Sequence, residues 1–105
     1  MVYSVYTTKN FDKEFIKLSQ EEQDRIQKIF HQVRGNPYAG DQLQIKILRE
    51  KRLREKRVYY LVFDDLNVVL FVATGNKKAQ QKTINYIIKY INEYRDYLKE
   101  LLNKN

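Results

Sequence analysis

Two copies of one five-residue unit make up the stretch Leu48-Arg49-Glu50-Lys51-Arg52-Leu53-Arg54-Glu55-Lys56-Arg57. It carries six cations against two acids and leads directly into the apolar segment 58–63. Because side chains alternate between the faces of a strand, a five-residue repeat on one straight strand would point its two copies to opposite faces. A bend between the copies removes this conflict, so we expect strands at 43–50 and 56–63 joined by a turn at 51–55. A charged helix is the alternative, but the β-branched and aromatic neighbours favour a hairpin.

Patterns on either side of this hairpin predict the other elements. We expect a strand at 2–7, a short helix over about 10–18, a second helix over 19–34, a buried strand at 68–73 and a final helix over 78–103. Ser19 and Glu22 form a capping-box pattern at the start of the second helix, and Gly35-Asn36-Pro37 ends it. The chain is therefore predicted to be α+β, with an N-terminal strand, two helices packed on an antiparallel sheet, and a long C-terminal helix. The sheet would contain the three-stranded meander and the first strand.

The final helix has an apolar stripe that runs through Ile84, Ile87, Ile91, Leu98 and Leu101. As one straight helix it would be about 39 Å long, which is more than the width of a domain of this size. The sequence thus predicts one domain over residues 1–105, with residues 92–105 overhanging it or covered by another chain.

The composition favours an anionic partner. The 105 residues contain 20 Lys and Arg against 13 Asp and Glu, and four of the seven excess charges lie between Arg49 and Arg57. Such a local field attracts polyanions, although a solvated basic surface without function is the alternative. The chain has no cysteine, which excludes disulfides and thiolate chemistry. It shows no signal-peptide or membrane-span pattern, so the sequence predicts a cytoplasmic protein with no membrane partner.

The order of elements and three local phrases resemble the RelE/ParE superfamily of toxins from type II toxin-antitoxin modules. The phrases are Asn36–Leu43, Lys56–Val62 and Val69–Lys78, and the resemblance covers about residues 2–91. The RelE branch cleaves messenger RNA in the ribosomal A site without metal, whereas the ParE branch poisons DNA gyrase and is not a nuclease. The density of cations on the predicted strands favours the RelE branch. A ParE-like gyrase poison and a basic RNA-binding domain without catalysis remain the alternatives.

The resemblance implies roles for particular cations in metal-independent attack by the 2′-hydroxyl, with no cofactor. Lys46 would act as base or phosphate ligand, Arg57 would clamp the transition state, and Lys77 or Lys78 would lie near the leaving oxygen. Lys51 or Lys56 could replace Lys46, because the doubled unit leaves the alignment open. The residues implied in RNA binding are Arg49, Lys51, Arg52, Arg54, Lys56 and Tyr86.

Two departures from the family pattern stand beside these roles. Asn76 and Lys77 occupy the place after the strand-ending glycine where family nucleases often have an arginine, and Tyr86 is the candidate for a base-stacking tyrosine. The single histidine, His31, is predicted to be structural or exposed, and Asp64-Asp65 is predicted to form a turn and not a metal site.

The resemblance also implies partners: the ribosome, messenger RNA and a cognate antitoxin. The antitoxin would cover the basic sheet face or the groove beside the C-terminal helix with an acidic or amphipathic segment. A dimer or a heterotetramer with the antitoxin is the implied assembly. All site roles require that Lys46, Arg57 and Lys77 gather on one surface of the sheet.

Overall fold

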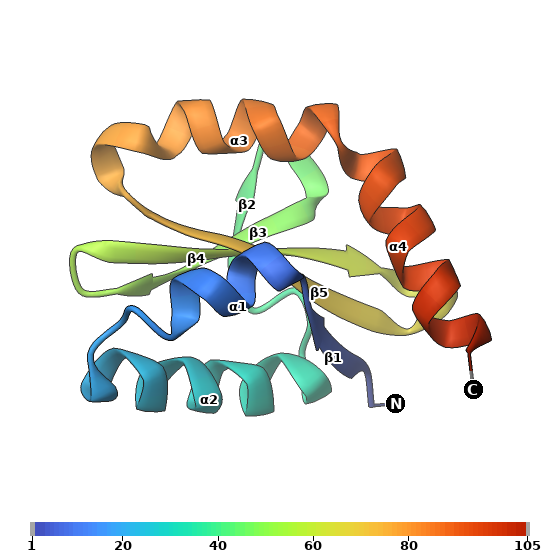
Figure 1. Ribbon diagram of the computed structural model, residues 1–105, viewed down its shortest axis with the longest axis horizontal. Helices are drawn as coiled ribbons and strands as arrows, with labels where there is room; N and C mark the ends of the chain where they lie inside the picture. Colours follow the sequence, from blue (N-terminus) through green and yellow to red (C-terminus); the bar gives the residue numbers. More distant parts are fainter. Residues whose placement is uncertain (1, 105) are drawn as a thin grey trace.

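Five strands form one mixed sheet, and helices cover both of its faces (Figure 1). The computed structural model describes residues 2–104. The elements in chain order are β1 (Ser4–Thr7), α1 (Lys9–Phe15), α2 (Gln20–Gly35), β2 (Asp41–Leu43), β3 (Ile45–Leu53), β4 (Lys56–Phe63), β5 (Val68–Asn76), α3 (Gln80–Lys89) and α4 (Ile91–Asn103), with short 3-10 helices at Asp64–Leu66 and Lys77–Ala79. The predicted α+β class is confirmed, including the N-terminal strand, the meander and the C-terminal helical region.

The strand order is β1-β5-β4-β3-β2, with β4 at the centre. β3, β4 and β5 form the predicted antiparallel meander. β1 differs, because it runs parallel to β5 from the pair Ser4–Val68 to the pair Thr7–Phe71. Parallel neighbouring strands need a long connection. Here the whole chain from α1 to β4 lies between β1 and β5. The sheet is consequently mixed and not wholly antiparallel.

Separate cores lie on the two faces of the sheet. On one face, α1 and α2 pack their apolar side chains against Val58, Tyr60 and Val62. On the other face, α3 and α4 cover Tyr59, Leu61 and Phe63. The segment Val68–Val72 is almost fully buried, as expected for a strand with helices on both sides. Alternate residues of β3, β4 and β5 therefore belong to different layers.

The hairpin between β3 and β4 is tighter than predicted. Its turn contains only Arg54 and Glu55, because Leu53 pairs with Lys56. The expected turn at 51–55 is thus wrong, and β3 continues through Lys51 and Arg52. Arg54 adopts a left-handed φ of 70°, a conformation usually assigned to glycine or asparagine, so no turn signal was present in the sequence.

The strand predicted at 43–50 is also divided. Gln44 has a left-handed φ of 58° and separates β2 from β3, which then pair with each other at the edge of the sheet. This reversal again lacks glycine or proline. Residues after Glu50 on β3 have no partner in β2, since the pairing ends at Asp41–Glu50. Next to the hairpin turn, no strand therefore pairs with the outer edge of β3 in the described part of the chain.

The C-terminal helix bends at Tyr90, where φ is −107° and ψ is 19°. A straight helix would exceed the longest dimension of the molecule, 35 Å, whereas the bend returns α4 to the end of the sheet (Figure 1). Leu98 is fully buried there, and Tyr97 donates a hydrogen bond to the Thr7 carbonyl at 3.3 Å. The predicted single helix over 78–103 and its overhang over 92–105 are therefore wrong for the described residues, because the apolar stripe of α4 packs on this domain.

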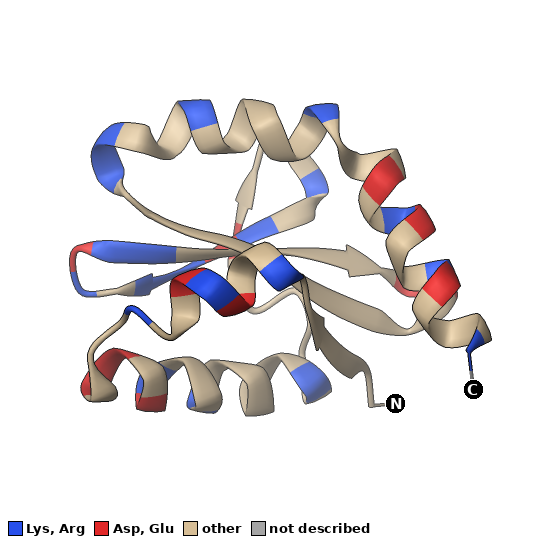
Figure 2. Ribbon diagram, viewed as in Figure 1, with Lys and Arg blue, Asp and Glu red and all other residues tan. Residues whose placement is uncertain are grey.

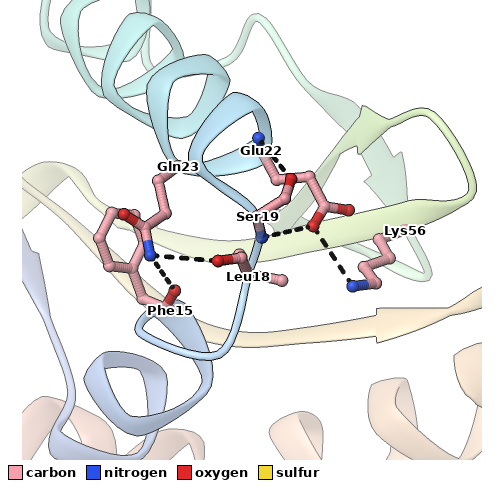
Figure 3. Close-up of polar contacts among 6 residues, drawn as sticks. All are labelled: Phe15, Leu18, Ser19, Glu22, Gln23 and Lys56. Atoms are coloured by element: carbon pink, nitrogen blue, oxygen red, sulfur yellow. Dashed lines mark hydrogen bonds and ion pairs between the residues drawn. The ribbon is translucent and has the colours of Figure 1, made fainter.

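The predicted capping box connects α2 to the hairpin (Figure 3). The Glu22 backbone N–H donates to Ser19 Oγ at 3.1 Å, and the Ser19 backbone N–H donates to Glu22 Oε1 at 3.0 Å. This backbone hydrogen bond is the main reason that the pKa of Glu22 is lowered. Lys56 Nζ lies 3.4 Å from the same Oε1, while Gln23 donates to the Phe15 and Leu18 carbonyls. The start of α2 is thereby held against β4.

Two tyrosines hold Asp64 at the other end of β4, and this contact predicts a pH-dependent contribution to stability. Tyr3 and Tyr38 donate to its carboxylate at 2.6 and 2.7 Å, and these hydrogen bonds lower its pKa below the usual 3.8. A carboxyl with a lowered folded-state pKa stabilises the fold fully above its unfolded pKa and loses this contribution as the pH falls through the folded-state value. We expect Asp64→Asn to lower the free energy of unfolding at neutral pH, and the difference from wild type to narrow below about pH 3.8.

Urea unfolding of both proteins across the acid range measures this difference. A constant gap at every pH would show that the loss in Asp64→Asn comes from packing and not from ionisation.

Candidate nucleic-acid interface

Five cations surround one depression of about 470 Å³ beside the hairpin turn. It lies between the tip of the β3–β4 hairpin and the connection from β5 to α3, where Figure 2 shows Lys and Arg on both ribbons. Its lining consists of Arg52, Arg54, Glu55, Arg57, Asn76, Lys77 and Lys78. Glu55 is the single acid among these residues. We call this set the hairpin depression, and its charge suits an anionic ligand.

The register of the sheet places these side chains together. Arg52 on β3 lies directly opposite Arg57 on β4, and Arg57 lies opposite Gly75 on β5. Like charges in directly opposed positions repel each other, so this pair costs stability unless an anion compensates it. After β5, Asn76 Oδ1 accepts a hydrogen bond from the Ala79 backbone N–H at 3.0 Å, and this cap holds the short turn that carries Lys77 and Lys78.

Arg57 is buried and oriented by an acid that the sequence analysis did not single out. Its Nη1 lies 2.5 Å from Glu50 Oε1, and the two side chains are 9% and 4% exposed. Gln80 at the start of α3 donates to the other oxygen of Glu50, also at 2.5 Å. The carboxylate thus connects β3, β4 and α3 and holds the guanidinium at the wall of the hairpin depression. The alternation Leu48, Glu50, Arg52 was the available signal, since it puts Glu50 on a core face.

Tyr59 lies on the same face of the sheet as Arg57 and Glu50. Its pKa is raised, first by burial and then by the nearby Glu50 charge, while Arg57 acts in the opposite direction. Among residues 2–104, neither the Tyr59 hydroxyl nor Arg57 Nε has a hydrogen-bond partner, although both are buried. These two polar groups therefore carry a desolvation cost that their surroundings do not offset.

Removing the unpartnered hydroxyl should stabilise the protein. We expect Tyr59→Phe to raise the free energy of unfolding by about 1 kcal/mol, because a buried hydroxyl without a partner costs more than its apolar replacement. Chemical denaturation followed by circular dichroism measures the change. A loss of stability in Tyr59→Phe would mean that the hydroxyl has a partner in solution. Tyr60→Phe provides the matched contrast, since the Tyr60 hydroxyl accepts a hydrogen bond from the Gly40 backbone N–H at 2.9 Å. This substitution should lower the free energy of unfolding.

The structure brings together three of the four predicted catalytic cations, Arg57, Lys77 and Lys78, but not Lys46. Lys46 lies six positions before Arg52 along β3, which corresponds to about 20 Å. Its Nζ is 5.3 Å from the centre of the Tyr38 ring, at the opposite end of β4 from Arg57. Because the turn occurs later than expected, β3 is longer and carries Lys46 away. The predicted gathering of Lys46 with Arg57 and Lys77 is therefore wrong.

Of the predicted RNA-binding residues, Arg52 and Arg54 line the hairpin depression, and Arg54 also pairs with Glu21 on α2. The others lie elsewhere. The cross-strand pairs of Arg49 and Lys51 are Tyr60 and Val58, so both cations point to the face covered by α1 and α2. Arg49 donates to the Gly40 carbonyl at 3.1 Å and packs on Tyr38. Lys56 is held by Glu22 on the same face.

Tyr86 is exposed on α3 and lines a different depression of about 230 Å³, where its ring packs against Tyr90 with centroids 4.7 Å apart. Its role in base stacking stays a prediction.

His31 is exposed on α2. Within residues 2–104, no three potential ligands of the His, Cys, Asp and Glu types come together as a metal site, and no helix has the length and apolar content to cross a membrane.

The comparisons with known proteins identify the fold. A double arginine-to-alanine variant of the E. coli toxin RelE in the free state superposes with a TM-score of 0.69, at 24% identity over 77% of this chain and 90% of that one. The fold is that of the RelE toxins. The archaeal RelE–RelB complex from Pyrococcus horikoshii gives 0.65 at 20% identity, over 73% of this chain and 97% of that one. The RelBE2 toxin-antitoxin complex of Mycobacterium tuberculosis gives 0.64 at 16% identity, over 73% and 100%.

The RelE fold is visible in structure and not in sequence-based comparison. No protein-family model matches the chain, and no curated protein matches its sequence. The resemblance noted in the sequence therefore depends on the order of elements and on short phrases around the strands. Two of these phrases, Lys56–Val62 and Val69–Lys78, contribute residues to the hairpin depression.

Proposed function

We propose that this protein is the toxin of a toxin-antitoxin module and that it inhibits translation by cleaving messenger RNA on the ribosome. The observation that carries the proposal is the gathering of Arg52, Arg54, Arg57, Lys77 and Lys78 around one depression. The RelE fold supports it, since the E. coli protein with this fold is a toxin. A cluster of like charges is costly for a fold, and binding of phosphate offsets this cost.

The reaction that these side chains support is attack of a ribose 2′-oxygen on the adjacent phosphorus. The 2′-oxygen loses its proton and bonds to phosphorus, the bond to the 5′-oxygen breaks, and that oxygen takes a proton. The products are a 2′,3′-cyclic phosphate and a 5′-hydroxyl. Charge develops on the phosphorane and on the leaving oxygen, so fixed cations accelerate the step without a metal.

The cations differ in what they can offer to this reaction. Arg57 is held by Glu50 and would present its planar guanidinium to the phosphorane oxygens. Lys77 and Lys78 are exposed on the turn before α3 and would neutralise or protonate the leaving oxygen. Arg52 and Arg54 would hold the neighbouring phosphates. Lys46 lies outside this arrangement, so the requirement that it gather with Arg57 and Lys77 is not met, and the proposal rests on the five cations of the hairpin depression. The proton acceptor is left to the ribosome or to solvent.

A partner antitoxin follows from the same proposal, because a free toxin of this kind must be neutralised. Several proteins with this fold were solved with RelB antitoxins. An acidic segment that covers the hairpin depression would be attracted by its cations, so its affinity should fall steeply with salt concentration. An affinity indifferent to salt would instead indicate that apolar contacts dominate this complex.

A reconstituted translation reaction tests the proposal. Purified ribosomes programmed with a defined message and incubated with the protein should yield cuts that primer extension locates, and no cuts should form on the same message without ribosomes. A gyrase supercoiling reaction run in parallel addresses the ParE-like alternative. Inhibited supercoiling together with an intact message would reject the proposal in favour of a gyrase poison.

A further inference from the structure

A second basic groove lies on the opposite side of β3 from the hairpin depression. It has a volume of about 480 Å³ and is lined by Arg25, Lys28, Ile29 and Gln32 of α2 and by Lys51 and Arg52 of β3. No acid belongs to this lining, and the one apolar member, Ile29, is only 6% exposed. We call it the α2–β3 groove. Apart from Ile29, its lining side chains end in charged or amide groups, and their aliphatic stems form much of the surface.

The positions of these cations follow from the secondary structure. Arg25, Lys28 and Gln32 recur at helical spacing on the exposed side of α2, while Ile26, Ile29 and Val33 face the core. Lys51 lies opposite Val58 and therefore points to the face that α2 covers. Among the described residues, Arg25, Lys28 and Lys51 take part in no ion pair, in contrast to Arg54, Lys56 and Arg57. Their charge is available to a ligand.

Arg52 joins this groove to the hairpin depression, because it lines both. It is exposed on the part of β3 that β2 does not cover, so the two basic surfaces meet across an open strand edge. Together they present eight cations, namely Arg52, Arg54, Arg57, Lys77 and Lys78 in the depression and Arg25, Lys28 and Lys51 beyond it. A ligand that follows all of them would be extended and would carry several negative charges.

We propose that the α2–β3 groove binds the phosphodiester backbone of the same RNA strand whose reacting phosphate occupies the hairpin depression. This inference rests on the proposed function and adds a binding site for the flanking nucleotides. Single-stranded RNA has a regularly charged and flexible backbone, and basic grooves of this kind follow it without reading its sequence. An amphipathic helix is a poorer match, since it requires an apolar stripe, and Ile29, the one apolar residue of the lining, is nearly buried.

Fluorescence anisotropy with 2′-O-methyl oligoribonucleotides tests the inference, because these ligands lack the attacking hydroxyl and stay intact. A ligand of about 12 nucleotides would reach both surfaces, whereas one of about four would fill the depression alone. We expect Lys28→Gln/Lys51→Gln to weaken binding of the long ligand about tenfold at 0.15 M salt, with a salt slope less steep by about 1.4, as expected for two lost phosphate contacts. Binding of the short ligand should not change.

The matched control is Lys89→Gln/Lys99→Gln, which removes the same charge from exposed positions on α3 and α4. Equal weakening by both double variants would assign the effect to net charge and overturn the inference, as would an unchanged affinity of Lys28→Gln/Lys51→Gln for the long ligand. Arg25→Gln, a single change on the surface of α2, is the second variant and should give about half the change in salt slope. Failure of the wild type to bind the short ligand would instead count against the proposed function.

Discussion

Replacing Glu50 by alanine is expected to lower the free energy of unfolding by about 3 to 5 kcal/mol. The change leaves the Arg57 guanidinium charged and buried without its partner, at a position where Arg57 Nε already lacks a hydrogen bond. Gln80 loses its acceptor in the same change. Urea denaturation of wild type and Glu50→Ala gives the difference directly.

A double variant distinguishes loss of the ion pair from loss of packing. Glu50→Leu/Arg57→Met replaces both charges with apolar groups of comparable size, and such replacements of buried pairs are often neutral or stabilising. We therefore expect the double variant to be more stable than Glu50→Ala. Should it be equally unstable, the pair would not be the reason for the loss. The double variant should nevertheless lack the proposed nuclease activity, because it has no guanidinium at the wall of the hairpin depression.

Removing the two lysines of the turn before α3 is expected to abolish most of the proposed cleavage. Lys77→Ala/Lys78→Ala should lower the rate of ribosome-dependent cutting by at least about 100-fold, since loss of a single group that stabilises developing charge commonly costs a factor of this order. Both side chains are exposed, so the free energy of unfolding should stay within about 0.5 kcal/mol of wild type. Primer extension at saturating ribosome concentration measures the rate.

The control for this variant is Lys89→Ala/Lys99→Ala, with the same loss of charge outside both basic surfaces. It should cut within about twofold of wild type, as surface substitutions remote from a site usually have small effects. Cleavage that falls equally in both variants would show that attraction to the ribosome by net charge limits the reaction. Cleavage that persists in Lys77→Ala/Lys78→Ala would remove these lysines from the mechanism.

The parts of the fold that the sequence predicted are those with local signals. The capping box of Ser19 and Glu22 begins α2, and the helix ends with Gly35, immediately before Asn36 and Pro37. Continuous apolar runs marked β4 and β5, because a strand buried on both faces has no polar alternation. The location of Arg57 and Lys77 at one end of the sheet followed from the ends of these two strands.

The remaining features depend on interactions that are distant in the sequence. Gln44 and Arg54 take left-handed conformations without the usual glycine. The local sequence therefore did not predict where the turns lie, and so did not predict the displacement of Lys46. The bend at Tyr90 is favoured by burial of Leu98 against the domain. The residue types near Tyr90 give no sequence signal for this bend. In the sequence, Glu50 is not distinguished from Glu55, which occupies the same position in the second copy of the five-residue unit. Strand alternation places Glu50 on a core face, but its pairing with Arg57 follows only from the register of β3 and β4.

The parallel pairing of β1 with β5 has a consequence for synthesis of the chain. β1 is among the first segments to leave the ribosome, yet its neighbour in the sheet is the last strand to be made. Contacts between such distant segments form late, since the intervening chain must first be ordered. Lys77 and Lys78 of the hairpin depression follow immediately after β5. Under the proposed function, a nascent chain would therefore lack the complete depression until all five strands have been translated.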